Sequence, residues 1–203
     1  MPASAAATCT EGSYAYAGFD SRSTTSGVGA TIEQAGPLEV RAGHVAGWVG
    51  IVEPGSGSAW LQAGLSAMPG DRRSGLYYEV AFPGHAPVYH EIARDIGRRE
   101  RHRLAVLEVR GRADWWRVWL DGEPATAPLR LRGSHGRWIA QVLGESWAAS
   151  AAGTCNAFAY AFSGVSFFGA DGRRLGLFGA VREDANYTVV RRSRWSFVAE
   201  TRP

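Results

Sequence analysis

The chain has 203 residues, 45% hydrophobic and 20% charged, which is enough to bury the core of one ordinary domain and excludes a disordered or fibrous protein. Its 22 basic residues are all arginine, and they are spread along the sequence rather than gathered in one segment. A net charge of +3 distributed in this way is weak evidence for nucleic-acid binding, and no apolar run reaches the ~20 residues of a membrane helix. We therefore expect neither nucleic acid nor membrane as a partner.

Short runs rich in Val, Ile, Tyr, Phe and Trp recur between turn-forming residues along the whole chain. This pattern predicts an all-β, antiparallel sandwich or jelly roll with little helix. The expected strands, in chain order, cover residues 45–52, 59–66, 75–82, 103–110, 115–121, 138–147, 157–168 and 187–198. Because neither a linker nor a repeat divides the sequence, we expect residues 1–203 to form a single domain.

The two cysteines, Cys9 and Cys155, lie near opposite ends of the chain. Neither belongs to a CxxC pair or a Cys/His cluster, so a disulfide between them is the most economical interpretation. Such a bridge would tie a flexible stub, residues 1–10, to a late strand. Since disulfides persist in oxidising compartments, we expect a secreted protein, although residues 1–7 do not form an intact signal peptide.

Alternation along the strands expected between residues 45 and 82 separates a core face from a second face. In residues 59–65, for example, the core face carries Ala59, Leu61, Ala63 and Leu65. The second face combines aromatic, small and polar residues: Trp48, Gly50, Trp60, Gln62, Gly64, Tyr77 and Glu79. Such a face suits a concave groove that binds an extended polymer.

The strand expected at residues 139–147 has a comparable second face. That face consists of Ile139, Gln141, Leu143, Glu145 and Trp147. Glu145 is the only carboxylate in this strand. If the strand lies beside residues 59–65, Gln62 and Glu145 meet across the groove.

These segments resemble the eqolisin family of glutamic peptidases, which are small all-β proteins with a concanavalin-like double sheet. Residues 47–51 resemble the family's Trp-Val-Gly-Ile motif, residues 60–65 resemble its Leu-Gln-Thr-Gly-Val motif, and Tyr78-Glu79 leading to Pro83 follows in the same order. Residues 145–147 resemble its Glu-Asp-Phe segment, while an alternative register places Gln141 at the family's glutamate. The resemblance covers about residues 44–168.

The resemblance implies an endopeptidase with a polypeptide substrate, an acidic working pH and a catalytic dyad of Gln62 and Glu145. The glutamate would take a proton from the attacking water and return it to the leaving amine. The glutamine amide would donate a hydrogen bond to the tetrahedral oxyanion. We expect substrate-binding roles for the residues around the dyad: Trp48, Trp60, Tyr77, Glu79, Gln141 and Trp147.

Two other functions fit the same architecture. A lectin-like module would stack a polysaccharide on Trp48, Trp60 and Tyr77 without hydrolysis, and a jelly-roll glycoside hydrolase would use Glu79 and Glu145 as its carboxylate pair. The five histidines show no metal-binding spacing, and the close pair His85 and His90 falls in a Pro/Gly-rich stretch that we expect to be a loop. We therefore expect no metal, no other cofactor and a monomer.

Overall fold

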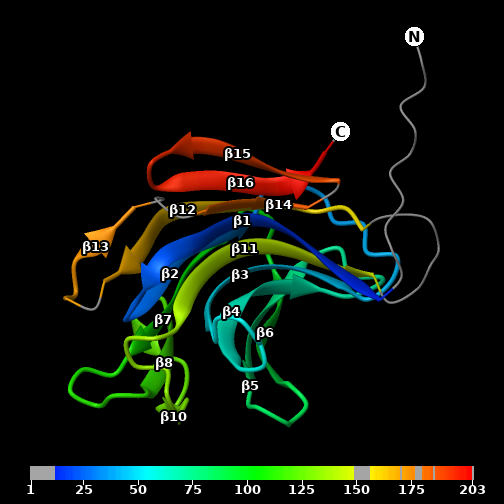
Figure 1. Cartoon of the computed structure of the whole chain (residues 1–203). Helices are drawn as coiled ribbons and strands as arrows, with labels where there is room; N and C mark the ends of the chain where they lie inside the picture. The colour runs from blue at the N-terminus through cyan, green and yellow to red at the C-terminus, as the bar shows by residue number, and fades with distance from the viewer. Residues whose placement is uncertain (1–11, 149–155, 170, 177–179, 185, 203) are drawn as a thin grey trace.

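The computed structural model describes residues 12–148, 156–169, 171–176, 180–184 and 186–202. Every regular element within these ranges is a β-strand, and the strands form two antiparallel sheets (Figure 1). The expected all-β sandwich is therefore confirmed. The described residues include no helix that could span a membrane. Cys9 and Cys155 both lie outside the described residues, so the disulfide stays a prediction.

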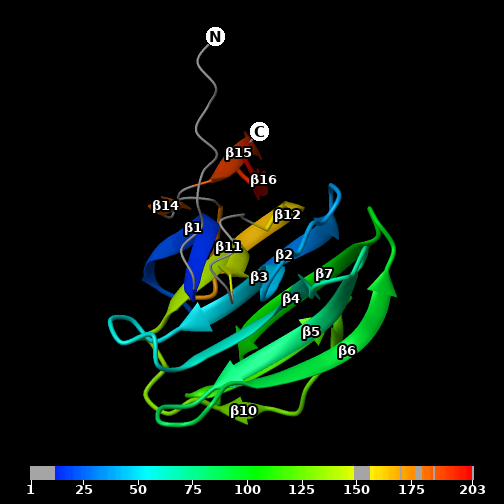
Figure 2. The ribbon, with the colours of Figure 1, turned by 90° about the vertical axis from the view of Figure 1, so that its right-hand side faces the viewer.

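One sheet contains seven of the described strands, and it includes the strands with the mixed aromatic and polar second face. Its order is β14 (Ala180–Glu183), β1 (Ser13–Thr24), β11 (Ile139–Ala148), β3 (His44–Val52), β4 (Trp60–Ala67), β5 (Ser74–Ala81) and β6 (Val88–Ile96). Figure 2 shows β3, β4, β5 and β6 following one another across this sheet as curved neighbours. Sequence-distant strands meet here, because β11 lies between β1 and β3.

The second sheet contains nine of the described strands and forms the other layer. Its order is β10 (Leu129–Arg130), β8 (Trp115–Leu120), β7 (Arg101–Glu108), β2 (Gly27–Gln34), β12 (Ala159–Phe168), β16 (Ser196–Thr201) and β15 (Tyr187–Ser193), with β13 (Arg174–Leu175) beside β12 and β9 (Glu123–Pro124) beside β8. The core lies between the two sheets and includes Ile32, Ile51, Leu61, Leu65, Leu104 and Phe162, each at most 1% exposed.

All eight expected strands are present, one of them divided into two, but seven of the described strands were not predicted: β1, β2, β6 and the short β9, β10, β13 and β14. The structure divides residues 187–198 into the hairpin β15–β16, with Ser193 paired to Ser196 at the turn. Most residues of β6 are exposed, so it lacks the apolar alternation that marks a strand. The expectation of a loop at His90 was wrong, because His90 lies in β6 with its ring stacked 4.4 Å from that of Tyr78.

Candidate active site

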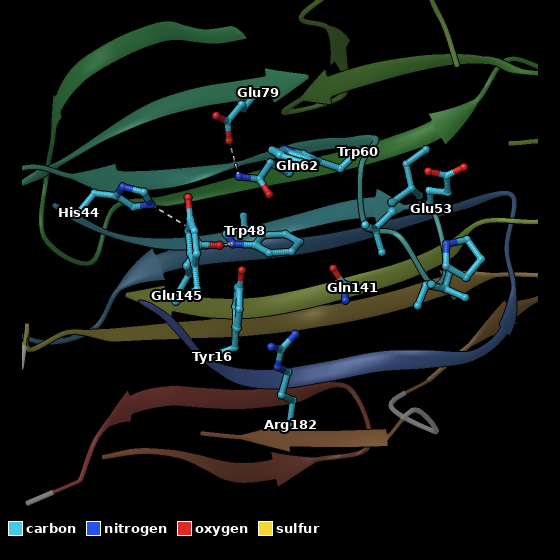
Figure 3. A pocket seen from close by; sticks show the side chains of 17 residues that line it. Tyr16, His44, Trp48, Glu53, Trp60, Gln62, Glu79, Gln141, Glu145 and Arg182 are labelled. Atoms are coloured by element: carbon cyan, nitrogen blue, oxygen red, sulfur yellow. Dashed lines mark hydrogen bonds and ion pairs between the residues drawn. The ribbon is translucent and has the colours of Figure 1, made fainter. Parts of the chain in front are cut away.

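The second faces of β3, β4, β5 and β11 line one pocket of about 460 Å³ (Figure 3). Alternation directs the side chains at positions 61, 63 and 65 of β4 into the core, which leaves Gln62 facing outward. The same rule brings Trp48, Glu79 and Glu145 to the pocket from the neighbouring strands. Gln62 and Glu145 therefore line the same cavity, although their strands are not neighbours.

Glu145 is held at both carboxylate oxygens by nitrogen atoms of β3. His44 Nε2 lies 2.8 Å from Oε1, and Trp48 Nε1 donates a hydrogen bond of 2.9 Å to Oε2. The Glu145 side chain is only 5% exposed, so burial removes most of the water that would solvate its carboxylate. The two nitrogen partners replace the hydrogen bonds of that water. The two contacts fix one rotamer and aim the carboxylate along the pocket floor.

Gln62 is equally fixed, by residues of the next strand. Its Nε2 donates to Glu79 Oε2 at 2.9 Å and to the Tyr77 hydroxyl at 3.2 Å. Gln62 and Glu79 are also direct register partners in β4 and β5, so the shorter contact follows from the sheet geometry. The amide is thereby held at the surface of the pocket.

The strand order corrects one part of the sequence-based expectation. β11 does not lie beside β4, because β3 separates them, and Gly50 of β3 pairs with Gln62 on one side and Gln141 on the other. Glu145 pairs instead with Ala46, further along β11. Gln141, whose Nε2 donates to Asp20 at 2.9 Å, is thus the residue that faces Gln62 across one strand.

Two glutamates of the pocket, Glu79 and Glu145, have different surroundings. Burial, and then the nearby charge of Glu145, raises the pKa of Glu79 above its ordinary value. The Gln62 amide that donates to Glu79 is neutral, whereas a histidine ring and an indole N–H face the oxygens of Glu145. Glu79 and Glu145 therefore lie in different environments within a pocket that Glu53 also lines.

The aromatic residues predicted to bind substrate occupy three kinds of position. Trp48 and Tyr77 are 4% and 2% exposed and belong to a buried cluster with Ala46 and Leu143; Trp48 lines this pocket, whereas Tyr77 does not. Trp60 is partly exposed and lines the wall. Trp147 packs against the His44 ring at 5.6 Å and does not line this pocket.

A smaller pocket of about 180 Å³ continues the first one toward β6. His44, Gln62 and Glu79 line both pockets, so these side chains lie where the two spaces meet. The smaller pocket is closed by Tyr77 and Tyr89, whose rings stack with centroids 5.1 Å apart. Together the two pockets form a groove that extends to both sides of Gln62 and Glu79.

Several pocket residues were missed by the sequence analysis. His44 lines the pocket, although its sequence spacing was tested only against metal-binding patterns. Tyr14, Tyr16 and Arg182 also line it, and they come from β1 and β14, which the sequence did not predict. Arg182 lies 3.9 Å above the ring of Tyr16, and burial raises the pKa of that tyrosine. Alternation of the two tyrosines with alanine in residues 14–17 is the sequence signal that could have revealed β1.

Within the described ranges, no group of three or more His, Cys, Asp or Glu side chains is arranged to hold a metal ion. The polar groups that line the pocket include the carboxyl groups of Glu79 and Glu145, the Gln62 amide and the His44 imidazole. These can transfer protons and donate hydrogen bonds to a developing negative charge. The groove thus combines two glutamates with a fixed glutamine amide on one face of an all-β double sheet.

Solved structures of eqolisin peptidases share this fold. Scytalido-glutamic peptidase with a transition-state analogue inhibitor matches at a TM-score of 0.68 and 16% identity, over 93% of this chain and 98% of that one. The same peptidase with a peptide-based analogue matches at a TM-score of 0.67, 16% identity and the same coverage. SCP-B, an eqolisin in complex with the tripeptide Ala-Ile-His, matches at a TM-score of 0.64 and 14% identity, again with the same coverage.

No family model matches the sequence, and no curated protein matches it significantly. At 14–16% identity the structural likeness establishes the fold alone. The resemblance noted in the sequence is confirmed at that level, since the chain has the double sheet of the eqolisin peptidases and resembles them at a distance.

Proposed function

We propose that the chain is a glutamic endopeptidase that works at acidic pH, with Gln62 and Glu145 as its catalytic pair. One observation supports this proposal most strongly. Gln62, Glu79 and Glu145 line a single pocket on a fold shared with peptidases that were crystallised with transition-state analogues. The proposed substrate is an extended polypeptide, for which a groove that continues on both sides of Gln62 is suited.

Glu145 acts as the general base in this proposal. Its carboxylate takes a proton from a water molecule while the water oxygen attacks the scissile carbonyl carbon. His44 and Trp48 hold the carboxylate in place, so little reorganisation is needed when the substrate binds.

Gln62 stabilises the oxyanion that forms in this attack. An amide N–H donor held in a fixed position can lower the barrier by ~3–4 kcal/mol. In the free protein the Gln62 nitrogen donates to Glu79 and Tyr77. The substrate oxygen must therefore replace one of these acceptors, and the other keeps the amide in place.

The acidic working range follows from the two glutamates. As pH rises, Glu79 ionises next to Glu145 and two like charges share one partly dehydrated pocket. We expect activity to decrease through that ionisation. We also propose that the protein is secreted and acts as a monomer without a metal or other cofactor.

The test is hydrolysis of denatured casein between about pH 2 and pH 7 by the parent protein, Gln62→Ala and Glu145→Gln. Glu39→Gln is the matched control, because Glu39 forms an exposed ion pair with Arg41 outside both pockets. Hydrolysis by the parent and the control but by neither pocket variant would support the proposal. A parent protein inactive at every pH would contradict it.

The carbohydrate alternatives are outcomes of a second assay. Burial of Trp48 and Tyr77 leaves Trp60 as the only partly exposed ring of the three expected to stack on sugars. We therefore place the peptidase first. Binding of a glycan array by an inactive protein would favour the lectin-like module, and release of reducing sugars that requires Glu79 and Glu145 would favour the glycoside hydrolase.

A further inference from the structure

We infer that Glu79 is a second catalytic residue, which donates the proton that the leaving amine needs while Glu145 takes the proton of the attacking water. This inference rests on the proposed peptidase function and assigns to two carboxyl groups what a single glutamate would otherwise do. It concerns this chain's own pocket, where two glutamates flank the same glutamine and tryptophan side chains (Figure 3).

The position of Glu79 is the first argument. Its Oε2 accepts the 2.9 Å hydrogen bond from Gln62, so the carboxyl group lies next to the amide that would bind the oxyanion. Glu79 lines both pockets and therefore stands where an extended substrate would pass from one to the other. A proton donor for the leaving nitrogen is needed at such a place, within hydrogen-bond reach of the scissile bond.

The environment of Glu79 is the second argument. Burial and the charge of Glu145 raise the pKa of Glu79, which favours the protonated form in weak acid. The titratable groups that face it are Glu145 on β11, His44 on β3, Tyr89 and Tyr77 beside it, and Tyr14 on β1. Of these groups His44 favours the ionised form, yet the pKa of Glu79 is still raised; Arg182 on β14 lines the same pocket but is not among the groups that shift this pKa.

The enclosure of Glu145 is the third argument. Its side chain is 5% exposed, and His44 and Trp48 each engage one of its oxygens. These contacts hold Glu145 where it would take the proton of the attacking water, whereas the carboxyl group of Glu79 already lies beside the amide that would bind the oxyanion. Gln141, which faces Gln62 across Gly50, has a neutral amide and cannot act as an acid in its place.

The proposed cycle balances. Water loses a proton to Glu145, its oxygen bonds to the carbonyl carbon, and the carbonyl electron pair moves to the oxygen that Gln62 binds. The tetrahedral intermediate then collapses, the C–N bond breaks, and the nitrogen takes the proton of Glu79. Glu145 releases its proton to solvent and Glu79 regains one, so the two groups return to their starting states.

Two substrates with the same acyl peptide separate the roles of the glutamates. One is a peptide amide, whose amine must be protonated to leave, and the other is its p-nitrophenyl ester, whose phenolate leaves without a proton. We expect Glu79→Gln to lower kcat for the amide by about 10²–10⁴-fold and to change kcat for the ester by less than about tenfold. Glu145→Gln should lose both activities, and Glu39→Gln should keep both.

Ester hydrolysis by Glu79→Gln also demonstrates that this variant is folded. The inference is overturned if Glu79→Gln keeps its amide activity, or if it loses ester and amide activity to the same extent. A parent protein that hydrolyses neither substrate would instead overturn the peptidase function, and the role of Glu79 with it.

Discussion

His44 contacts Glu145, although nothing in the sequence pattern predicted a role for it. It was one of five histidines without a metal-binding pattern, yet its Nε2 lies 2.8 Å from a carboxylate oxygen of Glu145. Tyr14 and Trp147 pack around its ring. A histidine held in this way orients the carboxylate, and it does so by position rather than by contact with the substrate.

Replacing His44 should therefore impair Glu145. Removing one hydrogen-bond partner of a charged group costs about 1.5–3 kcal/mol, which corresponds to a decrease of about 10- to 150-fold in kcat for His44→Ala. Steady-state kinetics on a peptide substrate measure this, with His85→Ala in an exposed loop as the control. Unchanged kcat and an unchanged pH profile in His44→Ala would show that His44 does not position Glu145.

Asp20, which contacts the pocket residue Gln141, should make the stability of the fold depend on pH. Asp20 accepts a hydrogen bond from Gln141, and burial raises the pKa of Asp20 above its ordinary value. Between the ordinary pKa of Asp20 in the unfolded state and its raised pKa in the folded state, the folded protein retains a proton that the unfolded protein has lost. The free energy of unfolding therefore decreases as pH rises through that interval.

Asp20→Asn should remove this contribution, because an amide does not ionise and its oxygen can still accept from Gln141. We expect the variant to gain stability relative to the parent as pH rises from about 3 to 7. Urea unfolding at several pH values measures the difference. If the two proteins keep a constant difference across the range, Asp20 does not titrate with the proposed sign.

At the scale of the strands, alternation predicted side-chain direction but not strand neighbours. It placed Gln62, Glu79 and Glu145 on outward faces, because a strand's period of two is a local property. It could not show that β3 lies between β4 and β11, since pairing depends on contacts between distant segments. Alternation therefore predicted which side chains of these strands face the pocket, whereas it could not predict that Gln141 faces Gln62.

Glycine determines how closely the two sheets approach at β3. A Cβ built on Gly47 would lie 2.6 Å from Cγ of Tyr160, a fully buried ring of β12 in the opposite sheet. The residue must therefore lack a side chain for Tyr160 to keep its place, where its hydroxyl lies 3.0 Å from the Ser74 hydroxyl.

Gly47→Ala should destabilise the fold by about 1–3 kcal/mol through overpacking, as measured by urea unfolding. Tyr160→Ala should also destabilise the protein, but the double variant should recover at least about 0.5 kcal/mol relative to additivity, because alanine lacks the Cγ atom that the added Cβ would meet most closely. Strict additivity of the two changes would contradict the proposed contact.

At the scale of the whole molecule, segments close to both cysteines meet at one end of β11. Gly12, shortly after Cys9, donates its N–H to the carbonyl oxygen of Ala148 at 2.7 Å. Asn156, directly after Cys155, donates to the carbonyl oxygen of Trp147 at 3.2 Å. The described flanks of the two cysteines thus lie at the same end of one strand, while the disulfide and secretion stay predictions.

Reduction should consequently destabilise the protein. In the chain-entropy model a bridge across so long a loop contributes about 4–5 kcal/mol, so Tm should decrease markedly in dithiothreitol. Intact mass measurement after thiol alkylation should find no free thiol before reduction and two afterwards. Two alkylated cysteines in the unreduced protein would exclude the bridge.

In the proposed mechanism Gln62 and Glu145 act together on one tetrahedral centre. A crystal structure with a peptide-based tetrahedral analogue tests it most directly. We predict the analogue's hydroxyl group within about 2.6–3.2 Å of both Gln62 Nε2 and a Glu145 oxygen, with the backbone of the analogue running through both pockets. An analogue bound elsewhere, or a tetrahedral centre beyond hydrogen-bond reach of either side chain, would contradict the account.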